Sequence, residues 1–490
     1  MNIKDFFDKD AQIQFDLLTA LTEKNHSIKK SSLINTLNIS TFVLEKSIYS
    51  LLDLFQLLQL NMSIHVHNYT DSVLLEGYNQ LDFEKIYYHF ANSSINHSIL
   101  VHLYLNRNFN IQKLSESLSL STSTTYRHIY QLNKGLKEFH LTIKNGKIKG
   151  DDLQLSYFFY QFFWYSLPPS QLKSKISDPE LLRFVNLLEK KMDITFTQNS
   201  RDRILLWCKI IKGNYSKDVH ISNIILNLID DFQTDPLYIM IKEAYLISQS
   251  HTAILGSDYI AAYIYIFLSS AFSADIQLCK IAHSTSSDMW PTRVQNVINL
   301  NEQFLDITCS YFGLNKQEIH SRVDPEYKYL LSVTHAGTCY FHGRIEDYMS
   351  SSFLVKNHET NIFEDLIQIL LEHLEREVQW KLVNTTRIYI SWVYQTLIDV
   401  ILSIGLPSIR IGVALNRSPL LLAAYVDALK KIYKQKEYVK VEAAVMDKYY
   451  NILVSDDVNL KHDFTFDRYY SMQEIEKDYT LPLREILNKY

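Results

Sequence analysis

Polar and cationic side chains gather between residues 121 and 150 in an arrangement that suits contact with a nucleic acid. A segment with helical spacing begins after Ser121 and leaves four side chains facing outward near its start: Thr122, Ser123, Tyr126 and Arg127. The hairpin sequence LTIKNGKIKG follows at 141–150 and carries Lys144, Lys147 and Lys149. Hydroxyl and guanidinium groups can hydrogen-bond to base edges in a major groove, and lysines neutralise phosphates. We therefore predict that these seven residues bind DNA.

The elements that would position these side chains occur twice. Segments 33–51 and 114–132 align without a gap at an offset of 81 residues, which pairs Leu33 with Leu114, Leu37 with Leu118, Ser40 with Ser121, Ile48 with Ile129 and Leu51 with Leu132. The first two leucine pairs predict a short helix, and the serine pair predicts a cap on the next helix. The isoleucine pair and the last leucine pair predict the contacts between the two helices. This pattern is typical of a helix-turn-helix, in which the start of the second helix enters the major groove.

A hairpin follows each copy and completes a winged helix-turn-helix. Asn145-Gly146 between alternating residues is a strong hairpin signal, because both turn positions favour a positive φ. The alternating segment 63–75 takes the same place after the first copy. Between Ile111 and Gly150 there are seven Lys or Arg against two Glu, whereas Met1–His65 holds six Lys against seven Asp or Glu. We expect the second unit to carry most of the DNA binding, and the first either to assist or to pack against protein.

With these features the chain resembles the Mga family of Gram-positive regulators, which contain phosphotransferase regulation domains (PRDs). The resemblance is carried by the tandem winged units, the wing at 142–150 and the aromatic run YFFYQFFWY at 157–165. It implies a mainly α, multidomain fold: winged units at 1–78 and 79–166, helical PRD bundles at 167–288 and 289–404, and a small α/β domain like a phosphotransferase IIB component at 405–490. Family members are transcriptional activators, often of surface and virulence genes, and tend to self-associate, which implies a homo-oligomer with a dimer as the expected state.

The middle of the chain shows helical periodicity that suits two bundles. Apolar residues recur three and four apart at 181–192, 221–232, 259–271 and 362–378, after a linker at Leu167-Pro168-Pro169-Ser170 and with a break at Trp290-Pro291. By resemblance, phosphotransferase phosphocarrier proteins would be partners and would phosphorylate a PRD histidine, for which His220, His283, His335 and His342 are the candidates. A phosphate there adds nearly two charges, enough to reorganise a helical interface.

From Pro407 onward the periodicity changes to alternating strands and helices. Segments 409–415, 439–445, 451–455 and 464–469 predict strands, and 419–433 and 481–490 predict helices, which together indicate a small open α/β sheet. A working IIB component carries its phosphate on a cysteine after the first strand, but this loop reads Asn416-Arg417-Ser418-Pro419 and no cysteine follows Cys339. We therefore expect a dimerisation or docking module, although Arg417 at a helix start could bind an anion.

Composition narrows the functional class. The net charge of −5 excludes a generally basic surface, and four widely spaced cysteines argue against a zinc knuckle or a disulfide framework and suit the cytoplasm. The apolar stretch 259–274 is too short to span a membrane and predicts a buried helix. No P-loop, GxGxxG or HExxH motif occurs, and His65 and His67 on one strand do not make a metal site. We expect no enzymatic activity, no cofactor, no metal and no membrane association.

Two alternatives stay open beside a DNA-binding activator. One is an RNA-binding antiterminator that shares the helical domains, although such proteins begin with a short β-rich RNA-binding domain. The other is a protein-interaction scaffold whose winged units bind protein. Because the candidate base-reading side chains are small and largely uncharged, we expect modest sequence specificity to which DNA shape contributes.

Overall fold

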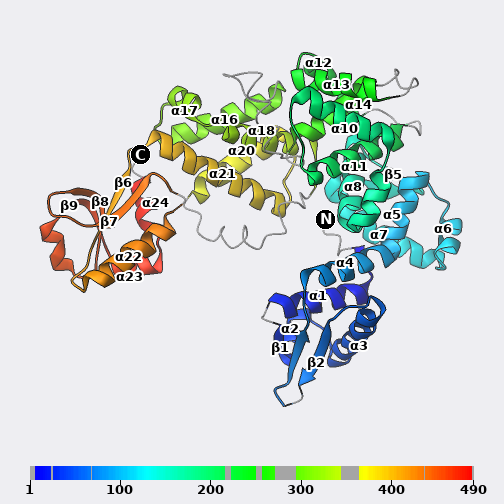
Figure 1. Ribbon diagram of the computed structural model, residues 1–490, viewed down its shortest axis with the longest axis horizontal. Helices are drawn as coiled ribbons and strands as arrows, with labels where there is room; N and C mark the ends of the chain where they lie inside the picture. The colour runs from blue at the N-terminus through cyan, green and yellow to red at the C-terminus, as the bar shows by residue number, and fades with distance from the viewer. Residues whose placement is uncertain are drawn as a thin grey trace.

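The computed structural model describes residues 6–23, 26–67, 69–215, 222–249, 257–270, 294–343, 363–434 and 436–487. The fold is mainly α and multidomain, as the sequence predicts. Figure 1 shows the N-terminal unit in blue projecting from a green and yellow helical body, with a small sheet in orange and red at the far end of that body. Buried apolar side chains form two clusters. One comes from residues 6–297 together with Ala336, Tyr340 and Phe341, and the other from residues 300–487. The domain boundaries expected from the sequence stay a prediction.

The first repeat folds into a winged helix-turn-helix. Its elements follow in the order α1 (Lys9–Glu23), β1 (Ser27–Lys29), α2 (Lys30–Leu37), α3 (Thr41–Leu57), β2 (Ser63–His67) and β3 (Ser72–Glu76). The three strands are antiparallel in the order β1-β3-β2, so that the β2–β3 wing is supported on one side by β1. Helix α4 (Gln80–Ser93) then leads to the second repeat.

The second repeat has the same plan with a smaller sheet. It comprises α5 (Ile95–Asn106), α6 (Ile111–Ser117), α7 (Thr122–Leu136), a short 3-10 turn (Lys137–Phe139), β4 (Thr142–Lys144) and β5 (Lys147–Lys149). A single bridge between Asn108 and Lys147 stands where the first repeat has the strand β1. The equivalent of a three-stranded sheet is thus reduced to a hairpin with one bridging residue.

Backbone conformation shows the repeat independently of side chains. Three residue pairs at the offset of 81 have a positive φ in both copies: His26 and Arg107 (67° and 63°), Asn38 and Ser119 (50° and 54°), and Gln59 and His140 (54° and 55°). These residues follow α1 and α5, α2 and α6, and α3 and the 3-10 turn after α7. Left-handed backbone is uncommon for residues other than glycine, so its recurrence at three matched points supports the alignment of the two units.

The aromatic run forms the spine of the first cluster. Helix α8 (Asp152–Ser166) follows the second wing, and nearly all of its residues are buried, including Tyr157, Phe158 and Tyr160. Around it lie α9 (Pro169–Ile176), α10 (Pro179–Met192), α11 (Gln198–Tyr215), α12 (Asn223–Phe232), α13 (Pro236–Ser248) and α14 (Ser257–Ser269). Helix α14 is buried on almost every side, which confirms the expected buried helix within the described part of 259–274.

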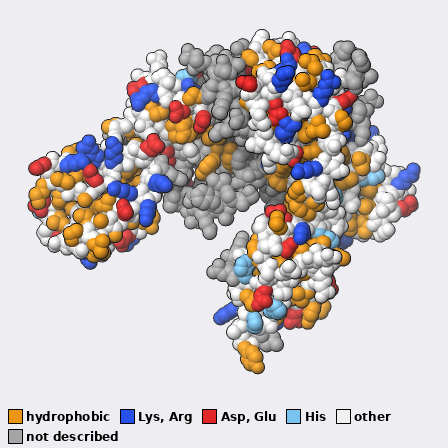
Figure 2. Space-filling view, viewed as in Figure 1, with side chains coloured by type: hydrophobic (Ala, Val, Ile, Leu, Met, Phe, Trp, Pro, Cys, Tyr) orange, Lys and Arg blue, Asp and Glu red, His pale blue; other side chains and the backbone are white. Residues whose placement is uncertain are grey.

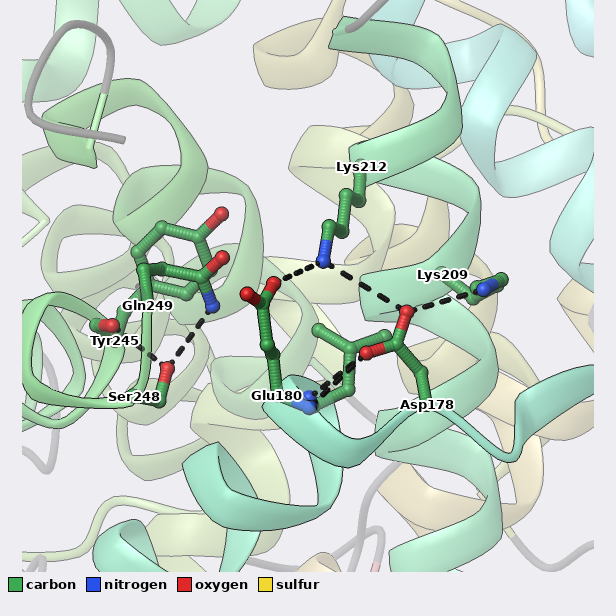
Figure 3. Close-up of polar contacts among 8 residues, drawn as sticks. Asp178, Glu180, Lys209, Lys212, Tyr245, Ser248 and Gln249 are labelled. Atoms are coloured by element: carbon green, nitrogen blue, oxygen red, sulfur yellow. Dashed lines mark hydrogen bonds and ion pairs between the residues drawn. The ribbon is translucent and has the colours of Figure 1, made fainter. Parts of the chain in front are cut away.

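Ion pairs fix the first two long helices of this region against each other. Asp178 caps α10, and its carboxylate lies 3.1 Å from Lys209 Nζ and 3.7 Å from Lys212 Nζ on α11 (Figure 3). Lys212 also binds Glu180 in the first turn of α10. Acidic residues at the start of a helix are favourable for that helix as well as for the contact.

The second cluster holds a further group of helices: α16 (Gln295–Tyr311), α17 (Lys316–Arg322), α18 (Pro325–Tyr340), α20 (Glu364–Val378) and α21 (Asn384–Gly405). Among the described residues, α21 is the helix long and apolar enough to cross a membrane, and half of its apolar window is buried inside the protein. Its buried side chains Val393, Leu397 and Ile401 belong to the second cluster, which accounts for its apolar character.

The C-terminal unit is a four-stranded parallel sheet. Its strands β6 (Ile409–Ala414), β7 (Val439–Ala443), β8 (Tyr449–Ser455) and β9 (Thr465–Ser471) are arranged in the order β7-β6-β8-β9. Three helices accompany them: α22 (Pro419–Ile432), α23 (Met472–Lys477) and α24 (Leu481–Leu487). The predicted small α/β sheet is confirmed, with α23 as an additional helix.

Candidate nucleic-acid interface

Helix α7 begins where its cap residue places it. The Ser121 hydroxyl accepts the N–H of Thr124 at 3.1 Å, as Ser40 accepts the N–H of Val43 in the first unit. The buried Thr125 hydroxyl lies 2.9 Å from Ser115 on α6 and joins the two helices of the motif. Ile129 and Leu132 are buried behind it. The predicted roles of the serine caps and the apolar positions are therefore confirmed.

The outward face of α7 carries the side chains that sequence spacing selected. Thr122, Ser123, Tyr126 and Arg127 are all exposed, and Tyr130 and Lys134 extend the face, with Lys134 Nζ 4.8 Å from the centre of the Tyr130 ring. Thr122, Ser123, Tyr126 and Arg127 offer hydrogen-bonding groups along the first half of the helix. In helix-turn-helix proteins this half meets base edges.

The wing is a tight hairpin whose turn is fixed by its neighbours. Asn145 and Gly146 have φ of 53° and 70°, which confirms the turn that the Asn-Gly pair predicts. A Cβ at Gly146 would lie 2.1 Å from the Phe109 carbonyl oxygen, and the Gly146 carbonyl accepts the Phe109 N–H at 2.8 Å. Lys144, Lys147 and Lys149 are exposed on the two strands. The lysines thus stand on a rigid projection beside α7.

A side chain that the sequence analysis missed holds the wing to the helix. The Asn133 amide on α7 accepts the Ile143 N–H at 2.6 Å and donates to the Ile143 carbonyl at 3.0 Å. It acts on the outer edge of β4 like one residue of a neighbouring strand. Nothing in the local sequence signals this contact, because an asparagine on a polar helix position is ordinarily solvated.

Electrostatics distinguish the two units. In the described part of the chain, no carboxylate lies within ion-pair distance of Arg127, Lys144, Lys147 or Lys149. In the first unit Lys30 pairs with Glu45 at 3.5 Å and Lys46 with Asp10 at 2.7 Å. The exposed face of α3 instead presents Phe42 and Tyr49, which are 75% and 69% exposed.

The chain as a whole carries 49 Lys or Arg and 54 Asp or Glu, so its positive and negative charges are nearly balanced. On the face shown in Figure 2, Lys and Arg side chains are interspersed with Asp and Glu. This distribution agrees with the net charge of −5. A surface for nucleic acid on this protein must therefore be local, because the chain as a whole is not basic.

The base of the second wing is joined to the helical body. The His140 ring, just before β4, stacks on His342 after α18 with ring centroids 4.0 Å apart, and Trp380 meets His342 edge to face with centroids 4.5 Å apart. The adjacent Gly343 has a φ of 95° and packs against the Phe139 ring. Contacts at the wing base thus connect the second winged unit to residues about 200 positions further along the chain.

Helix α8 also contacts the residues that follow α18. The Gln154 side chain accepts the His342 N–H at 3.0 Å and donates to the Tyr340 carbonyl at 2.5 Å. The Tyr157 ring stacks on Phe341 with centroids 4.4 Å apart. Residues 340–343 are therefore held by the helix that directly follows the wing.

The candidate phosphorylation histidines differ in access. His335 is 1% exposed, and its Nδ1 and Nε2 lie 2.7 Å from Asn301 and 2.9 Å from Tyr394, so a phosphate has no path to either nitrogen in this conformation. Burial lowers the pKa of His335 to about 3. His342 is partly exposed, and burial together with His140 lowers its pKa to about 4. His220 and His283 lie outside the described residues.

The loop after β6 is occupied by the chain's own carboxylates. Asp456 after β8 accepts the Asn416 N–H at 2.8 Å and the Arg417 Nε–H at 2.9 Å. These hydrogen bonds hold the pKa of Asp456 below its usual range, despite some burial. The Arg417 anion site expected from the sequence is thus already filled by an internal anion.

Within the described residues, no group of three or more His, Cys, Asp or Glu side chains is placed to hold a metal ion. His65 lies 3.0 Å from Ser63 and 3.3 Å from Glu76 across the first wing. These contacts bind His65 to its own sheet.

Comparison with known proteins agrees with this geometry. Residues 79–163, which contain the whole second unit and most of α8, match the family described as the Mga helix-turn-helix domain. A protein named as a trans-acting regulator in Streptococcus pneumoniae is 25% identical over 164 residues, 33% of this chain and 32% of that protein. The capsule synthesis positive regulator AcpA of Bacillus anthracis is 25% identical over 218 residues, 43% of this chain and 44% of that protein. The matched segments therefore span less than half of each relative.

Proposed function

We propose that this chain, a transcriptional regulator of the Mga type, binds duplex DNA mainly through its second winged unit. The start of α7, with Thr122, Ser123, Tyr126 and Arg127, would enter a major groove. Lys144 and Lys147 would hold the phosphate backbone beside it, with Lys149 adding charge at the base of the wing. The match of residues 79–163 to a helix-turn-helix domain favours DNA over RNA as the nucleic acid.

The observation that carries this proposal is the difference in charge pairing between two units of the same fold. Arg127 and the wing lysines are exposed without a carboxylate partner among the described residues, whereas the lysines of α2 and α3 are paired with acids. Counterion release on phosphate binding requires cations that are available. In the first unit, the one lysine of α3, Lys46, is paired with Asp10, and α3 exposes aromatic side chains, which suits an assisting or protein-binding role.

We further propose that the helical body controls this DNA contact and that the output is activation. A dimer or larger homo-oligomer would set the number and spacing of DNA-binding units. Phosphorylation by phosphotransferase phosphocarrier proteins would act through a histidine, and His342 is the described candidate that touches the winged unit. A phosphate on His342 would place about two negative charges beside His140 and force the stacked rings apart. The proposed setting is the cytoplasm, without catalysis or membrane association.

The test is duplex-DNA binding across a salt series by the intact protein and by an Arg127→Ala/Lys147→Ala double variant. Each lost phosphate contact should reduce the slope of log K against log salt by about 0.9, and affinity should fall at every salt concentration. A Lys190→Ala/Lys440→Ala variant, which removes two exposed lysines of α10 and β7, is the matched control and should behave like the wild type. Absence of binding by the wild type at low salt would favour the scaffold alternative.

A further inference from the structure

A cleft of about 980 Å³ runs along one flank of α7, between the two winged units. One wall is the start of α1, where Asp8, Lys9 and Gln12 lie, and the other is the flank of α7 from Thr124 to Glu138. Residues from opposite ends of the first 140 positions thus line one groove. It lies directly beside the helix proposed to read DNA.

The periodicity of α7 shows which side of the helix this flank is. Thr125, Ile129, Leu132 and Leu136 are buried and define the inner face. At 100° per residue, Ser123, Arg127 and Lys134 lie opposite that face. Asn133, which binds the wing, is on one side of this outer face, and His128 and Gln131, which line the cleft, are on the other. The wing and the cleft therefore flank the outer face of the recognition helix from opposite sides.

Three cations meet at the cleft. Lys9 projects from α1, and Arg127 and Lys134 from α7, and all three are exposed. None of them has a carboxylate within ion-pair distance among the described residues. Two acids, Asp8 and Glu138, also line the cleft, but both are partly buried, and Asp8 accepts the N–H of Ile95. The exposed charge of the walls is therefore mainly positive.

The two walls are held in register by a polar bridge at the floor. Asn96 donates from Nδ2 to the Phe6 carbonyl at 3.2 Å, and its Oδ1 lies 2.9 Å from His128 Nδ1 on α7. Phe6 and Phe7 are buried against Phe162 and Phe90. Lys9, two residues further on, thus starts from an anchored segment, and its distance from α7 is set by packing.

We propose that this cleft seats a phosphodiester strand of the DNA that the second winged unit binds. Lys9 of the first winged unit would contact the phosphate backbone of that strand. A helix in a major groove has a phosphate strand on each side. The wing lysines meet one strand, and Lys9 and Lys134 meet the other. The proposal rests on DNA binding by α7 and adds to it that the first unit completes the site without reading bases.

The experiment measures duplex-DNA binding by the full chain over a salt series. The cleft variant is Lys9→Ala/Lys134→Ala, and the control is Lys190→Ala/Lys440→Ala. The wing variant Lys144→Ala/Lys147→Ala removes the contacts proposed for the other strand. We expect the cleft variant to lower the slope of log K against log salt by about 1.8, for two lost contacts. Between 50 and 200 mM salt, the affinity of the wild type should therefore fall by a factor about 12-fold larger than the affinity of the cleft variant. A Lys9→Glu variant, which reverses the charge, should weaken DNA binding more than removal of the Lys9 charge alone. Circular dichroism should be unchanged because Lys9 is exposed.

The outcomes separate this inference from the function on which it rests. If the wild type binds DNA and the wing variant loses slope while the cleft variants match the control, the cleft does not hold a strand and the inference is overturned. If the cleft variants lose binding only to a small anion such as inorganic pyrophosphate and keep the DNA slope, the cleft is an effector site and the inference is also overturned. If the wild type binds no duplex at low salt, the proposed function itself is wrong.

Discussion

The joint between the second wing and the helical body gives a stringent test at Gly343. This residue has a φ of 95°, and a Cβ there would lie 2.7 Å from two carbons of the Phe139 ring. A left-handed conformation costs an L-residue about 1–2 kcal/mol, and overpacking a filled site adds about 1–3 kcal/mol. Because Phe139 is itself packed against Tyr157 and Phe158, its ring cannot turn away freely. We expect Gly343→Ala to destabilise the joint by about 2–5 kcal/mol on these grounds.

Calorimetry and limited proteolysis would measure this effect. Gly343→Ala should unfold at a lower temperature and be cut faster between the winged units and the body. Gly213→Ala in α11 is the control, since among the described residues its Cβ would meet the Tyr104 hydroxyl alone, at 3.4 Å, and alanine favours a helix by about 1 kcal/mol. Equal melting and cleavage of Gly343→Ala and the wild type would refute the idea that residues 340–343 are locked against the wing base.

Two further perturbations act on the same region. Asn133→Ala removes both hydrogen bonds to Ile143, which are worth about 1–3 kcal/mol together. DNA affinity should therefore fall while helical circular dichroism stays constant. Unchanged affinity would mean that the wing does not need this Asn133 clamp. Acid should weaken the joint, because the pKa of His342 is lowered from 6.5 to about 4: its contribution is complete above about pH 6.5 and is lost as the pH falls towards 4. Proteolysis between pH 7 and 4.5 should show this loss, and His342→Gln should remove that pH dependence; a wild type with a flat profile would contradict it.

Local signals in the sequence were sufficient for the elements and for the outward face of α7. Ser121 marks the helix start because its hydroxyl has one favourable use there, and the Asn145-Gly146 pair fixes a turn because few residues accept its backbone angles. The strands and helices after Pro407 follow from a change in periodicity that needs no knowledge of tertiary structure.

Contacts between distant segments were not accessible in this way. The His140–His342 stack joins residues from two different parts of the fold, and the Asp456 carboxylate reaches the Arg417 loop from a neighbouring strand. Each of these side chains has an ordinary solvated role in its own segment, so nothing local distinguishes it. The cleft beside α7 was missed for the same reason, since Lys9 reads as part of an acidic N-terminus until the packing of Phe6 and Phe7 places it there.

The two winged units have the same fold but support their wings in different ways. Positive φ recurs at three matched positions, so the turns of that fold are kept. In the first unit, β2 and β3 pair over five residues and β1 pairs with β3 at the edge, so that backbone hydrogen bonds to β1 support the wing. In the second, β4 and β5 pair over three residues with one bridge beside them, and Asn133 stands where the first unit has Leu52. A shorter wing held by a side chain of α7 is tied directly to that helix. The clamp is therefore expected to move the wing lysines and the base-reading face as one body, which is what a contact with both groove and backbone requires.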